Sequence, residues 1–596
     1  MMPPALLRRA SCRGRLALWL TFAALGGLLF SFLPYSVVKP LGDALVPDGS
    51  LDLLTPQAFS HIQTLLREGA LLWGAALLAL WSAGERAEAA LCGLRRRREA
   101  LPARLRADAR ALLGLLRRRP HPATLWLLAF LTLTAAWLRA LWLDAPMQYD
   151  EAYTYAAFAS RPLRYVVSDY HLPNNHIFHS LLVHFSAALF GVHPWSVRLP
   201  VFLTGVLLVP LGYLTARLLY DRPTAILTAA LITVSHPLIL YAANARGYTL
   251  LTAFTLLALS LAALILRRDN LLAWAGLSLV GALGAWTLPV MLYPFSMTLA
   301  WLGLGWLLGD AGRPRPRAFL LKLLLCGAGA ALGAGALYTP VLLTSGWEAL
   351  AGNRWVSPLS WPDFWENLPL RLGNTWQEWH AQWPSPLVWL GNAGVAAAML
   401  AGRRVRRFAA PLWGAALLGI FPFLVIQRVA PIPKVWLFFL PIWWMWTAAG
   451  MRLLLGKALR LLGVQQSQRR LVPAFLAGAV LLGVAAIPWE TGIRSRTTRS
   501  PLDEIPQAAA YIQAHRQAGD GVLVPDPLSA PAWFAFAEQG AGREVFVDRN
   551  PEGDFSHVWV ILNPKQHRPE RVLPQAEWPA PALRLPHLDV YRLEAP

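Results

Sequence analysis

The chain has 596 residues, of which 56% are hydrophobic and only 15% are charged. Soluble proteins carry about 25% charged residues, so this composition excludes an ordinary soluble enzyme. The net charge of +21 comes from basic runs between apolar segments, for example residues 95–98, 313–317 and 403–407. That pattern is typical of cytoplasmic loops under the positive-inside rule, and it argues against nucleic-acid binding.

Apolar segments of about 20 residues recur along the chain, and each is long enough to cross about 30 Å of hydrocarbon. We interpret the first as a retained span, because its apolar run is long and lacks a clear small-residue cleavage site. The predicted topology has about thirteen spans, with the N-terminus inside and the C-terminus outside. The spans are residues 16–36, 69–84, 123–143, 197–219, 223–241, 248–266, 270–287, 289–308, 320–343, 386–401, 408–427, 435–452 and 472–488.

The apolar segment 174–191 is predicted to lie at the outer interface and not to cross. His176, His179 and His184 fall on one arc of a helical wheel, with apolar residues opposite. The segment is also short for a crossing at about 1.5 Å per residue. If it does not cross, the later basic runs all fall inside, as the positive-inside rule favours.

Two carboxylates, Asp150 and Glu151, follow the span 123–143 and therefore face outward in this topology. Arg246 and Lys434 lie in two other outer turns. Ionisable residues at a membrane are usually paired or functional, so we expect these residues to converge. The alternatives are a solvated acidic pair and basic side chains that snorkel to the surface.

This arrangement suits a polyprenyl-phosphate sugar. Arg246 and Lys434 are predicted to bind the lipid phosphate, and Asp150 is predicted to accept a proton from the attacking acceptor. If a metal is present, its expected ligands are Asp150, His171 and His176. The further residues predicted to contact substrate are Glu151, His171, Asn175 and His176.

Two other regions face outward in the predicted topology. Residues 345–385 are rich in Trp, which indicates an interfacial belt or a surface that stacks on sugars or covers a lipid tail. Residues 489–596 are polar and Pro-rich, and they are expected to form a cap or acceptor-binding module. Its predicted elements are a helix over 503–517 and strands over 521–524, 544–547, 558–562 and 588–591.

Five short motifs stand out in and after the first outer loop. They are Tyr149-Asp150-Glu151-Ala152-Tyr153, the run from His171 to His176, Leu189-Phe190-Gly191-Val192, Val197-Arg198-Leu199-Pro200 and Ala245-Arg246-Gly247-Tyr248. They resemble motifs of the C-type (GT-C) glycosyltransferases, most closely glycosyltransferase family 39, which includes protein O-mannosyltransferases and lipid A aminoarabinose transferases. The resemblance covers residues 123–300 well and 300–490 by topology only. The chain departs from it in Leu172-Pro173-Asn174-Asn175-His176, where many relatives have His-Pro-Pro-Leu, and at Lys434, where many have Arg-Tyr.

The resemblance implies an all-α polytopic membrane protein of the GT-C fold with outer interfacial helices, and we add a small C-terminal α/β soluble domain. Residues 1–122 form an N-terminal hairpin and a basic cytoplasmic segment in this interpretation. Residues 123–488 form the catalytic domain, with outer loops 144–196 and 345–385, and residues 489–596 form the extracytoplasmic domain.

The resemblance also implies a glycosyltransferase that uses a polyprenyl-phosphate sugar and inverts the anomeric carbon, with Asp150 as base. No cofactor is certain, and a divalent metal stays open. The expected partners are the lipid-linked donor, a glycan, lipid or protein acceptor, and the bilayer of the plasma (inner) membrane. A flippase of lipid-linked glycans and a non-catalytic scaffold are the rival interpretations. A transporter places its ionisable residues near mid-membrane, whereas Asp150 is predicted at the outer rim.

Overall fold

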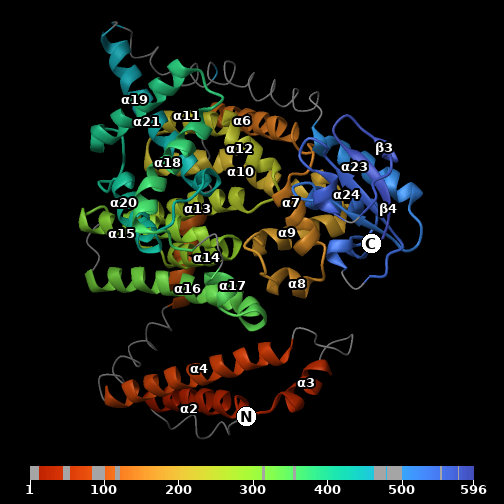
Figure 1. Cartoon of the computed structure of the whole chain (residues 1–596). Coiled ribbons are helices and arrows are strands. Elements are labelled where there is room, and N and C mark those ends of the chain that lie inside the picture. Colours follow the sequence, from red (N-terminus) through yellow and green to blue (C-terminus); the bar gives the residue numbers. More distant parts are fainter. Residues whose placement is uncertain are drawn as a thin grey trace.

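The structure is a computed structural model in which a large helical bundle carries a small sheet domain at one end (Figure 1). The predicted span 472–488 lies outside the described residues except for position 478. The described residues are 12–44, 54–83, 101–114, 121–311, 316–352, 357–461, 463, 478, 500–550, 553–574 and 576–595.

Long apolar helices form the bundle, and a continuous apolar core runs through it. Helices that are apolar on most sides are typical of a membrane or of a large core. They are α6 (Pro122–Ala140), α10 (Pro194–Leu219), α11 (Arg222–Val234), α13 (Tyr248–Arg267), α14 (Leu271–Thr287), α15 (Leu292–Leu307), α16 (Pro316–Ser345), α19 (Ser385–Ala401), α20 (Leu412–Gln427) and α21 (Leu440–Leu461).

Short helices connect these long ones, and several of them carry the residues predicted to be functional. They are α7 (Tyr149–Tyr153), the π-helix η1 (Thr154–Ala159), α8 (Leu163–Ser168), α9 (Ile177–Phe190), α12 (His236–Leu240), η2 (Tyr241–Ala243), η3 (Pro289–Met291), α17 (Glu348–Ala351), α18 (Trp361–His380), η4 (Gly402–Arg404) and η5 (Pro433–Phe439).

The N-terminal hairpin consists of α2 (Cys12–Phe30), α3 (Tyr35–Asp43) and α4 (Pro56–Ser82). The predicted span over 16–36 contains a break that the sequence did not predict, because α2 and α3 meet at 102°. Pro34 lies at this break in an extended conformation, and the residue before a proline disfavours the helical region. Helix α4 begins earlier than predicted, at Pro56, where the Thr55 side chain accepts a bond from the Ala58 amide.

Eight of the described helices are long and apolar enough to cross a membrane, or ten if each of two bent pairs is one span. Helices α14 and α20 are apolar but shorter. Each predicted span within the described residues is therefore helical at least in part. The chain is a multi-pass membrane protein, and its total number of spans stays a prediction.

The basic loops gather at one end of the bundle. The Arg407 amide donates to the Leu219 carbonyl at 2.9 Å, and Arg104 and Lys322 both pair with Asp269. The residues predicted to bind substrate belong to turns at the other ends of these helices. This division agrees with the predicted topology, because it separates the positive loops from the acidic pair.

Helix α9 does not join the two ends of the bundle. Asp150 comes before α9. Arg246 comes after it, beyond α10, which leads to the other end of the bundle, and α11, which returns. Because Asp150 and Arg246 form an ion pair, both ends of α9 lie at the same end of the bundle. The polar side of α9 does not face solvent. His179 is fully buried against protein, whereas Phe185 and Leu189 are exposed. Ile177 and Val183 are also fully buried, so the exposed apolar residues belong to the C-terminal half of α9.

The C-terminal domain is a mixed sheet with helices. Strands β1 and β2 are parallel, and the other neighbours are antiparallel, in the order β1-β2-β4-β3. The strand predicted over 544–547 was wrong: two short 3-10 turns replace it, and only Phe546 bridges to Val522. The elements are α23 (Pro501–His515), β1 (Asp520–Leu523), α24 (Ser529–Glu538), η7 (Arg543–Val545), η8 (Val547–Arg549), β2 (His557–Leu562), α25 (Pro569–Val572), β3 (Leu583–Arg584) and β4 (Asp589–Glu594).

The sheet domain lies beside α7 and α9 (Figure 1). Its helix α24 shares an apolar core with α7 and η1: the rings of Tyr155 and Phe534 lie 5.4 Å apart. The domain was expected as a cap, and this packing fixes it directly against the loop that carries Asp150.

Candidate functional site

Asp150 stands in the first turn of α7, close to the end of span helix α6. The Asp150 carbonyl accepts hydrogen bonds from Thr154 Oγ1 at 2.8 Å and from Asn174 Nδ2 at 3.0 Å. The second bond ties the polar run 168–176 to α7. Exposed backbone amides at a helix start favour a carboxylate, so this position suits an ionised Asp150.

The Asp150 carboxylate forms ion pairs with two cations that are far away in sequence. Arg246 Nη1 and Lys434 Nζ both contact Asp150 Oδ2, the second at 2.9 Å. The Asp150 side chain is 43% exposed, whereas Arg246 is only 5% exposed. The structure therefore brings the predicted carboxylate and the two predicted phosphate-binding cations into one cluster.

Charge sets the protonation of this cluster. Burial alone would raise the pKa of Asp150, but Arg246 and Lys434 together outweigh it and hold that pKa below its ordinary value. Asp150 is thus ionised, and it neutralises part of the charge of the two cations. Both cations also lie near the Tyr248 ring, at 5.6 and 6.0 Å from its centroid.

Glu151 was predicted to bind substrate, and the structure contradicts this. Its side chain is fully buried and accepts bonds from the guanidinium of Arg198 and from the backbone amides of Gln148 and Ala245, both at 2.9 Å. A buried carboxylate whose oxygens are all engaged has no site left for a ligand. Glu151 instead joins the start of α7 to the turn that carries Arg246.

Arg198 completes this buried connection and was not predicted as a site residue. It donates to Glu151 and also to the carbonyls of Leu143 at 2.8 Å and Pro146 at 3.1 Å. The sequence placed Arg198 in a motif shared with the GT-C glycosyltransferases, but a charge near the start of an apolar helix equally indicates snorkelling. The pair therefore positions Asp150 without reaching solvent.

His176 was predicted to bind substrate, and it lies beneath Arg246. Its Nδ1 accepts from the Gly247 amide at 2.8 Å, and its Nε2 is 3.2 Å from Arg246 Nη2. Burial, and then the charge of Arg246, lowers the pKa of His176 well below its ordinary value. A Cβ at position 247 would lie 3.2 Å from His176 and 2.8 Å from Thr287, so this contact needs glycine.

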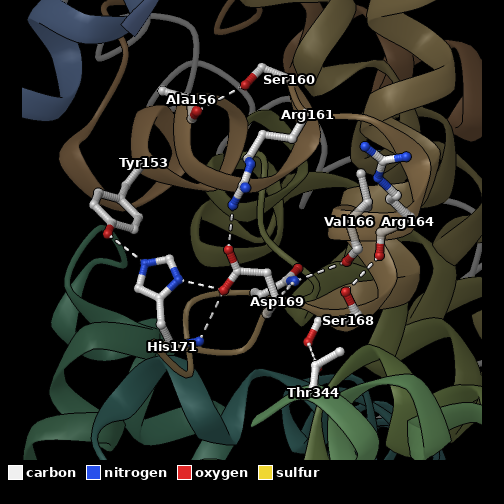
Figure 2. Close-up of polar contacts among 11 residues, drawn as sticks. Tyr153, Ala156, Ser160, Arg161, Arg164, Val166, Ser168, Asp169, His171 and Thr344 are labelled. Atoms are coloured by element: carbon white, nitrogen blue, oxygen red, sulfur yellow. Dashed lines mark hydrogen bonds and ion pairs between the residues drawn. The ribbon is translucent and has the colours of Figure 1, made fainter. Parts of the chain in front are cut away.

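His171 belongs to a second polar group, with Tyr153 and Asp169 (Figure 2). His171 Nε2 is 3.0 Å from the Tyr153 hydroxyl, and its Nδ1 is 2.6 Å from Asp169, which also pairs with Arg161. Asn175 is buried and donates to the Asp169 carbonyl at 2.7 Å. Asn175 thus shapes the loop, contrary to the predicted substrate contact, whereas His171 is half-exposed.

The metal hypothesis has no support in the described residues. They contain no group of three His, Cys, Asp or Glu side chains that is arranged to hold a metal ion. His171 points to Tyr153 and Asp169, and His176 points to Arg246. The proposed set Asp150, His171 and His176 does not fit a metal, so no step below uses one.

Residues 174–339 match the family described as dolichyl-phosphate-mannose-protein mannosyltransferase. A search among curated proteins finds no match. Among solved structures, ArnT from Cupriavidus metallidurans in the apo state aligns at 15% identity and a TM-score of 0.51, covering 79% of this chain and 98% of ArnT.

Two further solved structures are similar at lower TM-scores. ArnT from Cupriavidus metallidurans bound to undecaprenyl phosphate aligns at 15% identity and 0.49, covering 79% of this chain and 98% of ArnT. The archaeal oligosaccharyltransferase AglB from Archaeoglobus fulgidus aligns at 12% identity and 0.44, covering 73% of this chain and 69% of AglB.

At 15% identity, the likeness to ArnT shows a common fold. The family match covers residues 174–339, which is less than half of the chain. Both findings support the resemblance to the C-type (GT-C) glycosyltransferases that the sequence motifs indicate.

Proposed function

We propose that this chain transfers a sugar from a polyprenyl-phosphate donor to an acceptor hydroxyl or amine, with Asp150 as the base. One observation carries the proposal: a half-exposed carboxylate meets two cations from distant segments at one end of the bundle. The matched family is named for a dolichyl-phosphate sugar, which is a donor of this kind. A polyprenyl tail stays in the bilayer, so its phosphate lies at the membrane surface. The cluster of Asp150, Arg246 and Lys434 is proposed to lie at the same level, where its cations can bind the phosphate.

Donor binding activates the base in this mechanism. The donor phosphate competes with Asp150 for Arg246 and Lys434, because both are oxyanions that seek the same cations. As the cations turn to the phosphate, the pKa of Asp150 rises toward its ordinary value. The carboxylate then becomes a better proton acceptor at the moment when the donor is in place.

The transfer step follows from that arrangement. The acceptor oxygen or nitrogen attacks the anomeric carbon, and its proton passes to Asp150. The bond from the anomeric carbon to the phosphate oxygen breaks, and the phosphate leaves with the electron pair. Arg246 and Lys434 stabilise its growing negative charge, and attack from the opposite face inverts the anomeric carbon.

The site is proposed to face the outside of the plasma membrane. The basic loops gather at the opposite end of the bundle, where Arg104 and Lys322 pair with Asp269. Positive loops favour the cytoplasm, so Asp150 and the sheet domain belong on the extracytoplasmic side. The acceptor is a glycan, a lipid or a protein that reaches this side.

The activity is tested with the purified protein, defined polyprenyl-phosphate sugars and glycan, lipid or peptide acceptors. The assay measures the release of polyprenyl phosphate. Asp150→Asn is expected to lower turnover about 100-fold or more, which is the usual contribution of a general base. Asp363→Asn, a change in the exposed first turn of α18, is the matched control and keeps full turnover. Undiminished transfer by Asp150→Asn would exclude the base assignment.

A further inference from the structure

A polar cavity of about 230 Å³ lies between the catalytic loop and the C-terminal domain, apart from the Asp150 cluster. The loop contributes Tyr153, Arg161 and His171 to its walls, and the sheet domain contributes Trp533, Arg543 and Arg549. The mechanism above uses none of these side chains. Their gathering from both parts of the chain calls for a role of its own.

The walls of this cavity carry more positive than negative charge. The residues that line it include three arginines but only one carboxylate, that of Asp548. Asp548 pairs with Arg549 at 3.2 Å, and Asp169 pairs with Arg161 at 2.6 Å. Among the described residues, which do not include the neighbouring positions 551 and 552, Arg543 has no acidic partner. At least one guanidinium is thus available to an anion.

Aromatic rings hold the second guanidinium of the sheet domain in place. The Arg549 guanidinium lies 4.9 Å from the centroid of Trp533 and 5.8 Å from that of Tyr153. A guanidinium stacked on rings keeps its planar fork fixed, so little freedom is lost when it binds an oxyanion. Flat apolar faces beside a cation are the features that recognise a sugar ring with an acidic group.

Tyr153, Arg161 and His171, which Figure 2 shows close together, also line the cavity. Because Asp169 accepts at His171 Nδ1, His171 Nε2 is left to accept from the Tyr153 hydroxyl. These two hydrogen bonds hold Tyr153 and His171 in place at the cavity. Tyr153 is three residues after Asp150 on α7, so the two residues lie within about one helical turn, about 5.4 Å along the axis.

We propose that this cavity is an acceptor subsite for a carbohydrate that bears an anionic group, a carboxylate or a phosphate. Arg543 and Arg549 bind the anion, and Trp533 packs on the sugar face. The assignment of this cavity to the acceptor rests on the proposed function, in which Arg246 and Lys434 bind the donor. The binding site itself stands on the cavity and its charges alone.

Binding of glucuronic acid, glucose and inorganic phosphate to the full-length protein in lipid nanodiscs tests this proposal without turnover. Glucuronic acid is expected to bind at least ten-fold tighter than glucose. Arg543→Gln and Arg549→Gln should each weaken it ten-fold or more, whereas Arg571→Gln, an exposed change on α25 outside the cavity, should leave it unchanged.

Three results would overturn the proposal. Glucose that binds as well as glucuronic acid would exclude the anion site, and so would full binding by both arginine variants. Inorganic phosphate that binds as tightly as glucuronic acid would exclude recognition of the sugar. Asp150→Asn should still bind glucuronic acid. Binding that persists while every transfer assay fails would thus count against the proposed function and not against this subsite.

Discussion

The buried pair of Glu151 and Arg198 offers the most informative perturbation. Glu151→Gln keeps the size of the side chain but removes its charge, and Arg198 then stays buried at 1% exposure without a counter-ion. Removing one partner of a buried ion pair costs about 3–5 kcal/mol. The carbonyls of Leu143 and Pro146 still accept from Arg198, so we expect about 3 kcal/mol, at the lower end of that range.

Thermal unfolding of the detergent-purified protein measures this loss as a fall in the apparent Tm. Arg452→Gln is the control, because its pair with Asp221 is 41% and 33% exposed and such pairs contribute about 0–1 kcal/mol. The structure predicts a lower Tm for Glu151→Gln and a near-native Tm for Arg452→Gln. A native Tm for Glu151→Gln combined with a raised KM for substrate would refute the structural role and restore Glu151 as a substrate ligand.

Two further perturbations address the Asp150 cluster. Lys434→Gln should move the acid limb of the kcat/KM profile to higher pH. Lys434 helps to lower the pKa of Asp150, and the carboxylate cannot accept a proton below that pKa; an unmoved limb would contradict the pairing. Gly247→Ala should weaken donor binding about ten-fold, since the added Cβ displaces His176 from beneath Arg246 at an overpacking cost of about 1–3 kcal/mol. Gly373→Ala, at an open position, is the control and should bind donor normally.

The helical bundle was largely predictable because its apolar segments leave few alternatives in a membrane. The charge cluster of Asp150, Arg246 and Lys434 was also predictable, since loop charge placed all three on one side. The break at Pro34 was missed because hydropathy does not register backbone direction. The loss of the 544–547 strand has a related cause: a short apolar run does not distinguish strands from turns.

Roles within the polar loop were harder to predict. Asp150 and Glu151 are adjacent in sequence and identical in charge, yet the side chain of Asp150 is 43% exposed and that of Glu151 is fully buried. Only tertiary contacts separate them, above all the position of Arg198. The cavity at Arg543 and Arg549 was likewise hidden, because its walls come from segments almost 400 residues apart, between Tyr153 and Arg549.

The central claim is that Asp150 is a base which competes with the donor phosphate for Arg246 and Lys434. The most direct measurement compares Asp150→Asn with wild type for both transfer and polyprenyl-phosphate binding. We predict that transfer falls about 100-fold or more, while polyprenyl phosphate binds more tightly because both cations are released. Full transfer, or weaker binding of the lipid phosphate, would contradict the claim.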